Sequence, residues 1–415
     1  MHLEYIIVKQ KRPFKQPYGY LEALILGAIF VISGFIIEII TPAKGFVFPK
    51  SPINIFILLA LILIIIFIHI FLTKYYFFKW LSSVPVAIST ISWTIFLVLI
   101  MAIVPQKVDI FYGFMDKMGF TYISENWALI FITFLLLISL GLITIQRAKP
   151  FNKKNIGFLL NHLGLWIVIA SASIGSGEQI RLKMYVSENS NPVWQAYDDN
   201  NIYELSIAIK LIDFELEQYN PEIALIDNIT GDIIIDNKNK IFLVEKGDEY
   251  KLNNLKIRID DFIPLSVYID GNYIEFFDQG AAASAKISVF DKEGELITTS
   301  WISSGSSLMN PNILKLDTLY SIALLEPQPK KYSSELELFA KDGTKEKVIL
   351  EVNKPYTFKG WKIYQLSYDE SMGRWSETSV LELVRDPWLP VVYLGLFMIL
   401  AGVIYIFWFG KYRKE

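Results

Sequence analysis

The chain has 415 residues, of which 53% are hydrophobic and 20% charged, and its formal net charge is −3. Soluble globular proteins usually carry about 25% charged residues. The apolar residues are gathered in long runs, so the composition predicts membrane spans rather than one enlarged soluble core. The small net charge argues against a nucleic-acid partner, and the absence of cysteine excludes disulfides, thiolate metal sites and Fe–S clusters.

Six stretches are long and apolar enough to cross a bilayer, which takes roughly 20 residues in a helix. They cover residues 21–41, 53–72, 84–105, 127–145, 158–177 and 388–409. The first has no small-residue cleavage site and is followed closely by the second, so we expect a retained span rather than a cleaved signal peptide. The sequence thus predicts an α-helical polytopic membrane protein. In it, 21–72 forms an N-terminal hairpin and 84–177 contains three further helices.

The orientation follows from the lysines and arginines in the short flanks of these spans. With the N-terminus inside, the inner flanks hold most of them: Lys9, Lys11, Arg12, Lys15, Lys74, Lys79, Arg147, Lys149, Lys153, Lys154, Lys411, Arg413 and Lys414. The two short outer loops hold only Lys44, Lys50, Lys107 and Lys117. We therefore predict that residues 1–20 and 410–415 are cytoplasmic and that the large segment 178–387 is extracytoplasmic.

Segment 178–387 changes from continuous apolar runs to alternation, as at 203–210, 255–259, 285–289 and 334–338. A period of two is typical of half-buried strands, and turn dipeptides such as Asp342-Gly343 separate them. The segment is therefore predicted to be all-β, an antiparallel sandwich or barrel-like structure of one domain or two. At its end Asp386 and Pro387 are suited to start the sixth helix, and Trp388 suits the membrane interface.

This segment shows no enzyme signature. It contains no histidine, so neither a Ser–His–Asp triad nor a His-ligated zinc is available. The acidic pairs Asp198-Asp199 and Asp260-Asp261 could serve as acid and base, but we interpret them as solvated carboxylates in turns. The predicted role of the segment is binding or scaffolding.

Two histidines, His69 and His162, lie within predicted spans. His69 is surrounded by isoleucine and leucine, so its imidazole needs a partner from another helix, a cofactor or water. Ionisable groups inside a membrane are costly and suggest function. By the predicted topology both histidines lie toward the cytoplasmic leaflet, where axial ligation of haem iron is one hypothesis. The alternative is an inter-helix hydrogen bond or an interfacial histidine. We expect Glu38, near the outer end of the first span, to reach the interface rather than to relay protons.

Four segments resemble the ResB/CcsB family of System II cytochrome c biogenesis proteins. Residues 353–369 resemble the distal part of that family's outer domain, and Arg385-Asp386-Pro387 before an apolar span resembles its C-terminal end. The Asn-His-Leu-Gly segment at 161–164 resembles its span before the outer domain, and Val-Pro-Gln at 104–106 the end of its first core span. The resemblance implies a four-span core at 84–177 and 388–409, with the hairpin 21–72 as an addition.

The resemblance also implies a function. A CcsB-like subunit, with a CcsA-like partner, is expected to move haem b across the bacterial inner membrane and to support its covalent attachment to the CxxCH thiols of apocytochrome c. His69 matches the transmembrane histidine that binds haem in fused CcsBA-type relatives, with His162 a weaker candidate ligand. Lys74 and Lys79 could pair with haem propionates or serve only as positive-inside charges.

The chain differs in one respect from the fused relatives, which combine CcsB-like and CcsA-like parts. The chain lacks the Trp-rich motif and outer histidines expected of CcsA, so it is expected to be a non-catalytic or co-catalytic half of a synthase complex. The alternatives are a receptor or scaffold with a β sensor domain, or a transporter subunit, without haem.

Overall fold

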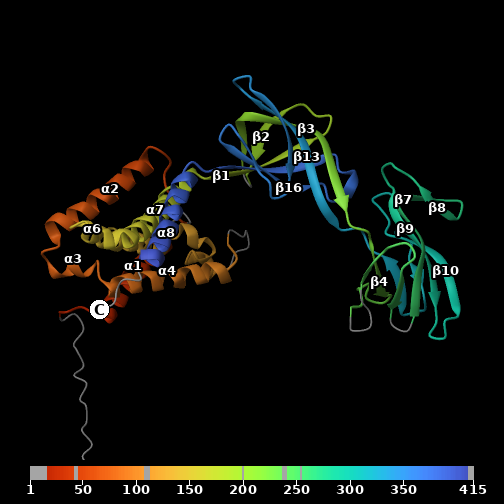
Figure 1. Ribbon diagram of the computed structural model, residues 1–415, viewed down its shortest axis with the longest axis horizontal. Helices are drawn as coiled ribbons and strands as arrows, with labels where there is room; N and C mark the ends of the chain where they lie inside the picture. Colours follow the sequence, from red (N-terminus) through yellow and green to blue (C-terminus); the bar gives the residue numbers. More distant parts are fainter. Residues whose placement is uncertain are drawn as a thin grey trace, which may run out of the picture. The chain divides into compact units, whose positions relative to one another are not determined.

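The computed structural model describes residues 16–41, 45–106, 113–198, 201–235, 241–252 and 255–409. The chain divides into two compact units (Figure 1). A helical unit takes the chain up to Gln179 and again from Asp386, and a β unit comprises Ile180–Arg385. The predicted cytoplasmic tail 410–415 and most of the predicted cytoplasmic segment 1–20 lie outside the described residues, as do seven of the inner-flank cations and two of the outer-loop lysines.

Among its described residues the helical unit contains six helices that are long and apolar enough to span a membrane, which confirms the predicted polytopic class. They are α1 (Tyr20–Ile40), α2 (Ile53–Phe67, extended by the π-helical turn η1, Ile68–Leu72), α4 (Val84–Ile103), α6 (Trp127–Ala148), α7 (Ile156–Ile174) and α8 (Leu389–Phe409). Short helical segments connect them: α3 (Tyr76–Trp80), α5 (Phe114–Lys117), η2 (Phe120–Glu125), η3 (Lys153–Asn155) and η4 (Ser176–Glu178).

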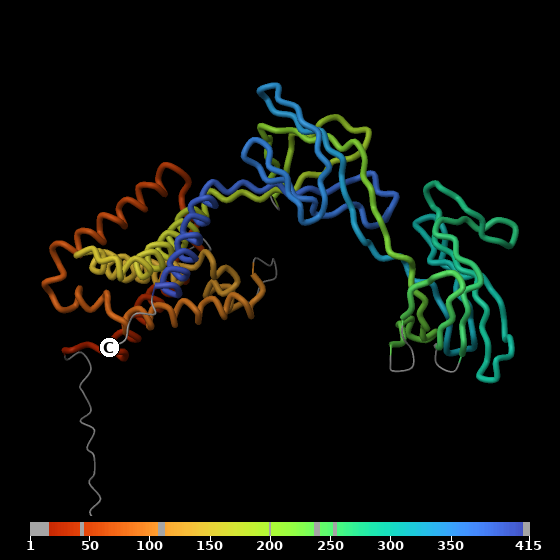
Figure 2. The backbone as a smooth tube through the Cα atoms, in the orientation of Figure 1, coloured from red at the N-terminus to blue at the C-terminus, as the bar shows by residue number. Residues whose placement is uncertain are grey.

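Helix α6 is the most buried of the six and packs against α1, α2, α4 and α7. Helix α8, blue in Figure 2, instead lies along α7. The two approach closely because glycines face each other: a Cβ at Gly164 would lie 2.7 Å from the carbonyl oxygen of Gly395. A second contact joins Gly157 to Gly402 one heptad away on each helix. Small residues of this kind let helix backbones approach within a bilayer.

Glu38 does not reach the interface as expected. Its side chain is buried. One carboxylate oxygen accepts the backbone N–H of Gly45 at 2.9 Å, and the other accepts that of Trp127, the first residue of α6, at 3.4 Å. The first amides of a helix have no partner within it and favour a negative charge nearby. Glu38 therefore joins the end of α1 to the start of α6.

The described part of the β unit forms three antiparallel sheets, which confirms the all-β prediction for this segment. The first is eight-stranded, in the order β14-β13-β3-β2-β1-β17-β16-β15. Its strands are β1 (Ile180–Ser187), β2 (Val193–Tyr197), β3 (Ile202–Gln218), β13 (Pro329–Ala340), β14 (Lys345–Glu351), β15 (Tyr356–Phe358), β16 (Trp361–Tyr368) and β17 (Thr378–Arg385). Its inward side chains form one core, to which all eight strands contribute.

The other two sheets share a second core. One has the order β10-β9-β7-β6 with β8 paired to β7: β6 (Glu249–Leu252), β7 (Leu255–Ile269), β8 (Asn272–Glu275), β9 (Ala282–Phe290) and β10 (Leu296–Ser303). The other has the order β11-β12-β4-β5: β4 (Glu222–Asp227), β5 (Phe242–Leu243), β11 (Leu314–Lys315) and β12 (Tyr320–Leu324). The sequence left open whether the segment is one domain or two. The structure shows one compact unit built around two separate cores.

Candidate functional site

His69 lies in the π-helical turn η1, where α2 ends. Its ring nitrogen Nδ1 is buried and forms no hydrogen bond with any described residue. Its carbonyl oxygen accepts the hydroxyl of Thr73 at 2.8 Å. Single π-helical turns often occur at functional sites, and a buried polar atom without a partner costs about 1–3 kcal/mol. The Nδ1 of His69 is therefore left without a partner among the described residues, and its predicted partner (another helix, a cofactor or water) stays a prediction.

His162 lies in the second turn of α7, and its own helix orients its ring. Its Nδ1 is 3.0 Å from the carbonyl oxygen of Phe158, and its ring stacks on the Phe158 ring with centroids 3.6 Å apart. A carbonyl only accepts hydrogen bonds, so Nδ1 is the protonated nitrogen. In the neutral imidazole the lone pair is then on Nε2, to which no described residue forms a hydrogen bond. This is the tautomer that binds a metal through Nε2.

His162 faces a cavity of about 490 Å³ between α4, α6 and α7. Most of its wall is aliphatic, and its ionisable residues lie toward the end where α4 and α7 begin and α6 ends. The lining residues are Ser82, Ser83, Val84, Ala87, Ile91, Thr94, Ile95, Leu136, Ser139, Leu140, Ile143, Arg147, Phe158, His162, Leu165 and Ile169. His69 is not among them. The structure therefore does not bring the two predicted histidines together in this cavity.

Several further polar residues line the cavity, and two of them, Arg147 and Ser83, matter for the site although the sequence did not identify them. Arg147, in the last turn of α6, places its guanidinium carbon 5.1 Å from the centroid of Phe158. Within the described ranges no carboxylate pairs with it. The hydroxyl oxygen of Ser83 is buried and also lacks a partner there. A cation close to a membrane histidine is the signal that could have identified Arg147, whereas the positive-inside rule treats Arg147 only as an inner-flank charge.

The Asn-His-Leu-Gly segment divides between two surfaces of α7. A Cβ at Gly402 of α8 would lie 2.7 Å from the side-chain oxygen of Asn161, so Asn161 and Gly164 face α8. His162 faces the cavity. Asn161 and Gly164 therefore serve helix packing, whereas His162 lines the cavity. Lys74 and Lys79 lie between η1 and α4, and no described contact joins either to His69.

The acidic pairs of the β unit are structural. Asp198 is exposed in a loop, as expected, and accepts the backbone N–H of Asn201 and the hydroxyl of Tyr203, whereas Asp199 lies outside the described residues. The interpretation of Asp260 and Asp261 as turn residues was wrong. Both lie within strand β7, at a bulge opposite β9.

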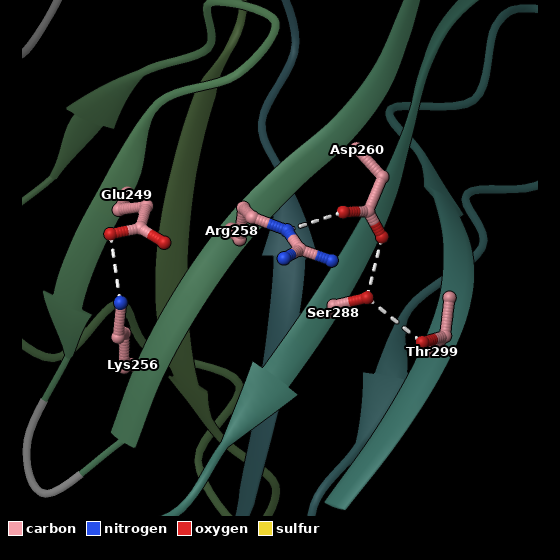
Figure 3. Close-up of polar contacts among 6 residues, drawn as sticks. All are labelled: Glu249, Lys256, Arg258, Asp260, Ser288 and Thr299. Carbon is pink, nitrogen blue, oxygen red and sulfur yellow. Dashed lines mark hydrogen bonds and ion pairs between the residues drawn. The ribbon is translucent and has the colours of Figure 1, made fainter. Parts of the chain in front are cut away.

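Asp260 takes part in the polar network drawn in Figure 3. It accepts the Arg258 Nε–H at 2.7 Å and the Ser288 hydroxyl, which also bonds Thr299. Burial raises the pKa of Asp260, but the Ser288 and Arg258 hydrogen bonds outweigh it and hold that pKa below its usual value. Asp261 pairs with Lys246 at 2.7 Å. An ionised, fully bonded carboxylate is a poor general base. No cluster of metal-binding side chains occurs within the described ranges.

The segment that carried the family resemblance forms a hairpin of β15 and β16. Its two-residue turn, Lys359-Gly360, has positive φ at both positions (47° and 82°), as the right-handed twist of paired strands favours. Phe358 and Trp361 flank the turn and are buried in the first core. The guanidinium carbon of Arg385 lies 6.0 Å from the Trp361 ring centroid, which gives this outer arginine a partner.

Residues 292–376, from the turn before β10 through this hairpin to the turn after β16, match the model of the ResB-like family. This part of the chain is similar to the ResB-like family. The match confirms the predicted resemblance to ResB/CcsB proteins and supports a role in cytochrome c biogenesis at the level of the family. A search of curated proteins found no match. The ResB-like segment contains neither His69 nor His162, so their assignment as haem ligands stays a prediction.

Proposed function

We propose that the chain is a CcsB-like membrane subunit which, with a CcsA-like partner, moves haem across the membrane and supports its attachment to apocytochrome c. The ResB-like segment favours cytochrome c biogenesis over the receptor and transporter alternatives. In this proposal haem is the transported substrate. The β unit presents apocytochrome c or braces the partner, and each CxxCH thiol adds across one vinyl group of haem. Holding thiol and vinyl together lowers the barrier by removing orientational entropy.

The observation that carries the haem assignment is the buried, unpartnered Nδ1 of His69. Iron coordination would satisfy a nitrogen of this ring, which the described residues leave without a partner. Axial-ligand identity and burial are two of the means by which a protein tunes the properties of haem. The second axial ligand is proposed to come from the CcsA-like partner.

The test is the absorption spectrum of the complex purified after co-expression with a CcsA-like partner. His69→Ala should lose the Soret band of the His69-bound haem, and added imidazole should restore it by entering the vacated position. His2→Ala, the same substitution outside the predicted spans, is the matched control and should leave the spectrum unchanged. A His69→Ala complex with the wild-type spectrum and haem content would remove His69 from the site.

Covalent cytochrome c formation tests the partner assignment separately. Co-expression of the chain, the partner and a cytochrome c precursor should yield holocytochrome, and omission of either membrane protein should abolish it. Holocytochrome formation by this chain without any partner would overturn its assignment as half of a synthase.

A further inference from the structure

The cavity of His162 combines three features that together define a ligand. Its wall is mostly aliphatic, it is about 490 Å³ in volume, and its two ionisable side chains, Arg147 and His162, lie toward one end. Small-molecule sites usually measure about 300–1,000 Å³ and have a few placed polar groups on an apolar surface. The ligand therefore has an apolar body and a polar end.

Arg147 defines the charge of that end. It has no carboxylate partner within the described ranges, and its stacking near Phe158 holds the guanidinium beside the cavity. A guanidinium pairs best with a carboxylate or phosphate, which it can bond through two N–H groups. Ser83 adds an unpartnered hydroxyl at the same end. The cavity thus suits an amphipathic anion.

His162 distinguishes among amphipathic anions. An anionic phospholipid would pair with Arg147 and fill the apolar part of the cavity, but it carries no metal for the His162 imidazole to coordinate. The Nδ1–H of His162 is committed to the Phe158 carbonyl, which leaves the Nε2 lone pair free to bind a metal. An iron porphyrin with carboxylate side chains offers a partner to each group. Its iron would bind the imidazole, a carboxylate would pair with the guanidinium, and the ring would pack against the apolar wall.

We propose that this cavity holds a haem distinct from the one assigned to His69, with His162 Nε2 on the iron and Arg147 paired with a propionate. The inference rests on the proposed function, because it takes haem to be the substrate. It adds a second position for haem within this chain alone. By the predicted topology that position lies at the cytoplasmic end of the helices, where a porphyrin would enter before transfer.

The test is a titration of the purified full chain in detergent with ferric haem, followed by absorption. In a His69→Ala background, one histidine-ligated Soret signal should remain, and His162→Ala should abolish it. Arg147→Gln should weaken the binding of haem roughly ten- to a hundredfold, the loss expected for a charge-assisted hydrogen bond. Lys149→Gln, which removes a nearby cation that does not line the cavity, is the matched control and should bind as the parent does.

A porphyrin without free carboxylates isolates the role of Arg147. The iron porphyrin dimethyl ester should bind wild type and Arg147→Gln equally, while still requiring His162. Equal weakening of both porphyrins by Arg147→Gln would show a change in packing and overturn the ion pair. Ala87→Phe, which places a ring in the cavity, should block both porphyrins without removing a polar group.

The outcomes separate this inference from the proposed function. If haem binding requires His69 but is unchanged by His162→Ala, the second site is refuted and the function stands. If the His162 signal persists while His69→Ala has no effect in the partner complex, the assignment of His69 fails and the cavity site stands. If His162→Ala and Arg147→Gln leave haem binding unchanged, and Arg147→Gln instead lowers the phosphatidylglycerol that co-purifies, the cavity is a lipid site.

Discussion

The indole N–H of Trp388 donates to the carboxylate of Glu178 at 3.1 Å, across 210 positions of sequence. The second oxygen of Glu178 accepts the backbone N–H of Ser51 and the amide of Asn54, the latter at 3.0 Å. One side chain after α7 therefore holds the beginnings of α2 and α8. Helix α2 belongs to the N-terminal hairpin, the predicted addition, and α8 belongs to the predicted four-span core. Glu178 therefore joins the addition to the core.

Loss of Glu178 is expected to destabilise the helical unit. In Glu178→Ala the amide of Asn54, which is fully buried, and the indole N–H lose their acceptor, at a cost of about 1–3 kcal/mol. Glu178→Gln keeps one acceptor oxygen and should lose less, and Trp388→Phe should lose only the single indole bond. The free energy of unfolding in mixed detergent micelles, measured for wild type and the three variants, tests this order of stability. Equal stability of wild type and Glu178→Ala would show that these bonds are not formed.

The glycine contacts between α7 and α8 give a second prediction. A Cβ at Gly395 would lie 2.7 Å from the carbonyl oxygen of Gly164, and backbone atoms cannot move aside as a flexible side chain can. Gly395→Ala should therefore destabilise the unit by about 1–3 kcal/mol, the usual cost of overpacking. Ala401→Val adds methyl groups to an exposed position of α8 and should be neutral. The measurement is the melting temperature of wild type and both variants. Equal melting temperatures for Gly395→Ala and wild type would contradict the close contact.

The β unit should lose stability in acid through Glu351. The Lys331 ammonium, with that of Lys354, lowers the pKa of Glu351 from its ordinary 4.5 to about 2. A carboxylate with a lowered folded-state pKa contributes stability above the unfolded pKa and loses it as pH falls through the folded pKa. The pairing of β13 with β14 should therefore weaken between about pH 4.5 and 2.

The measurement is urea unfolding of the full chain in detergent, followed by tryptophan fluorescence at several pH values. Glu351→Gln should lower stability at pH 7 and have little effect near pH 2, so its pH dependence is flatter than that of wild type. Glu293→Gln, in the exposed turn before β10, is the control. A wild-type pH profile in Glu351→Gln would exclude the ion pairs as its cause.

The elements were predictable because each depends on a short stretch of sequence. Length and hydropathy alone located the six helices, and alternation located strands such as β13, where Leu336 and Leu338 are buried in the first core. The order of strands was not predictable, because β3 pairs with β13 more than a hundred residues away. Periodicity assigns a side chain to a face of its strand or helix but does not say what packs on that face.

For the same reason, the sequence predicted only part of the candidate site. Sequence identified both membrane histidines and their lack of local partners, but not that His162 faces a cavity between α4, α6 and α7 from which His69 is absent. Arg147 and Ser83 join that cavity because three helix ends meet, which no local pattern records. Glu38 was misjudged for a similar reason. Its partners are the amides of Gly45 and Trp127, and the latter begins a helix far along the chain.

The orientation of the helices can be tested directly because the chain contains no cysteine, so one introduced cysteine supplies a single thiol. The excess of lysine and arginine on one side of the spans predicts that Lys74 is cytoplasmic and Lys292, in the β unit, extracytoplasmic. In right-side-out spheroplasts a membrane-impermeant maleimide should label Lys292→Cys at once and Lys74→Cys only after permeabilisation. Both positions are exposed, so burial does not account for protection. Labelling of Lys74→Cys in intact spheroplasts would reverse the topology and place the ends of α4, α6 and α7 that carry Ser83, Arg147 and His162 on the outer side.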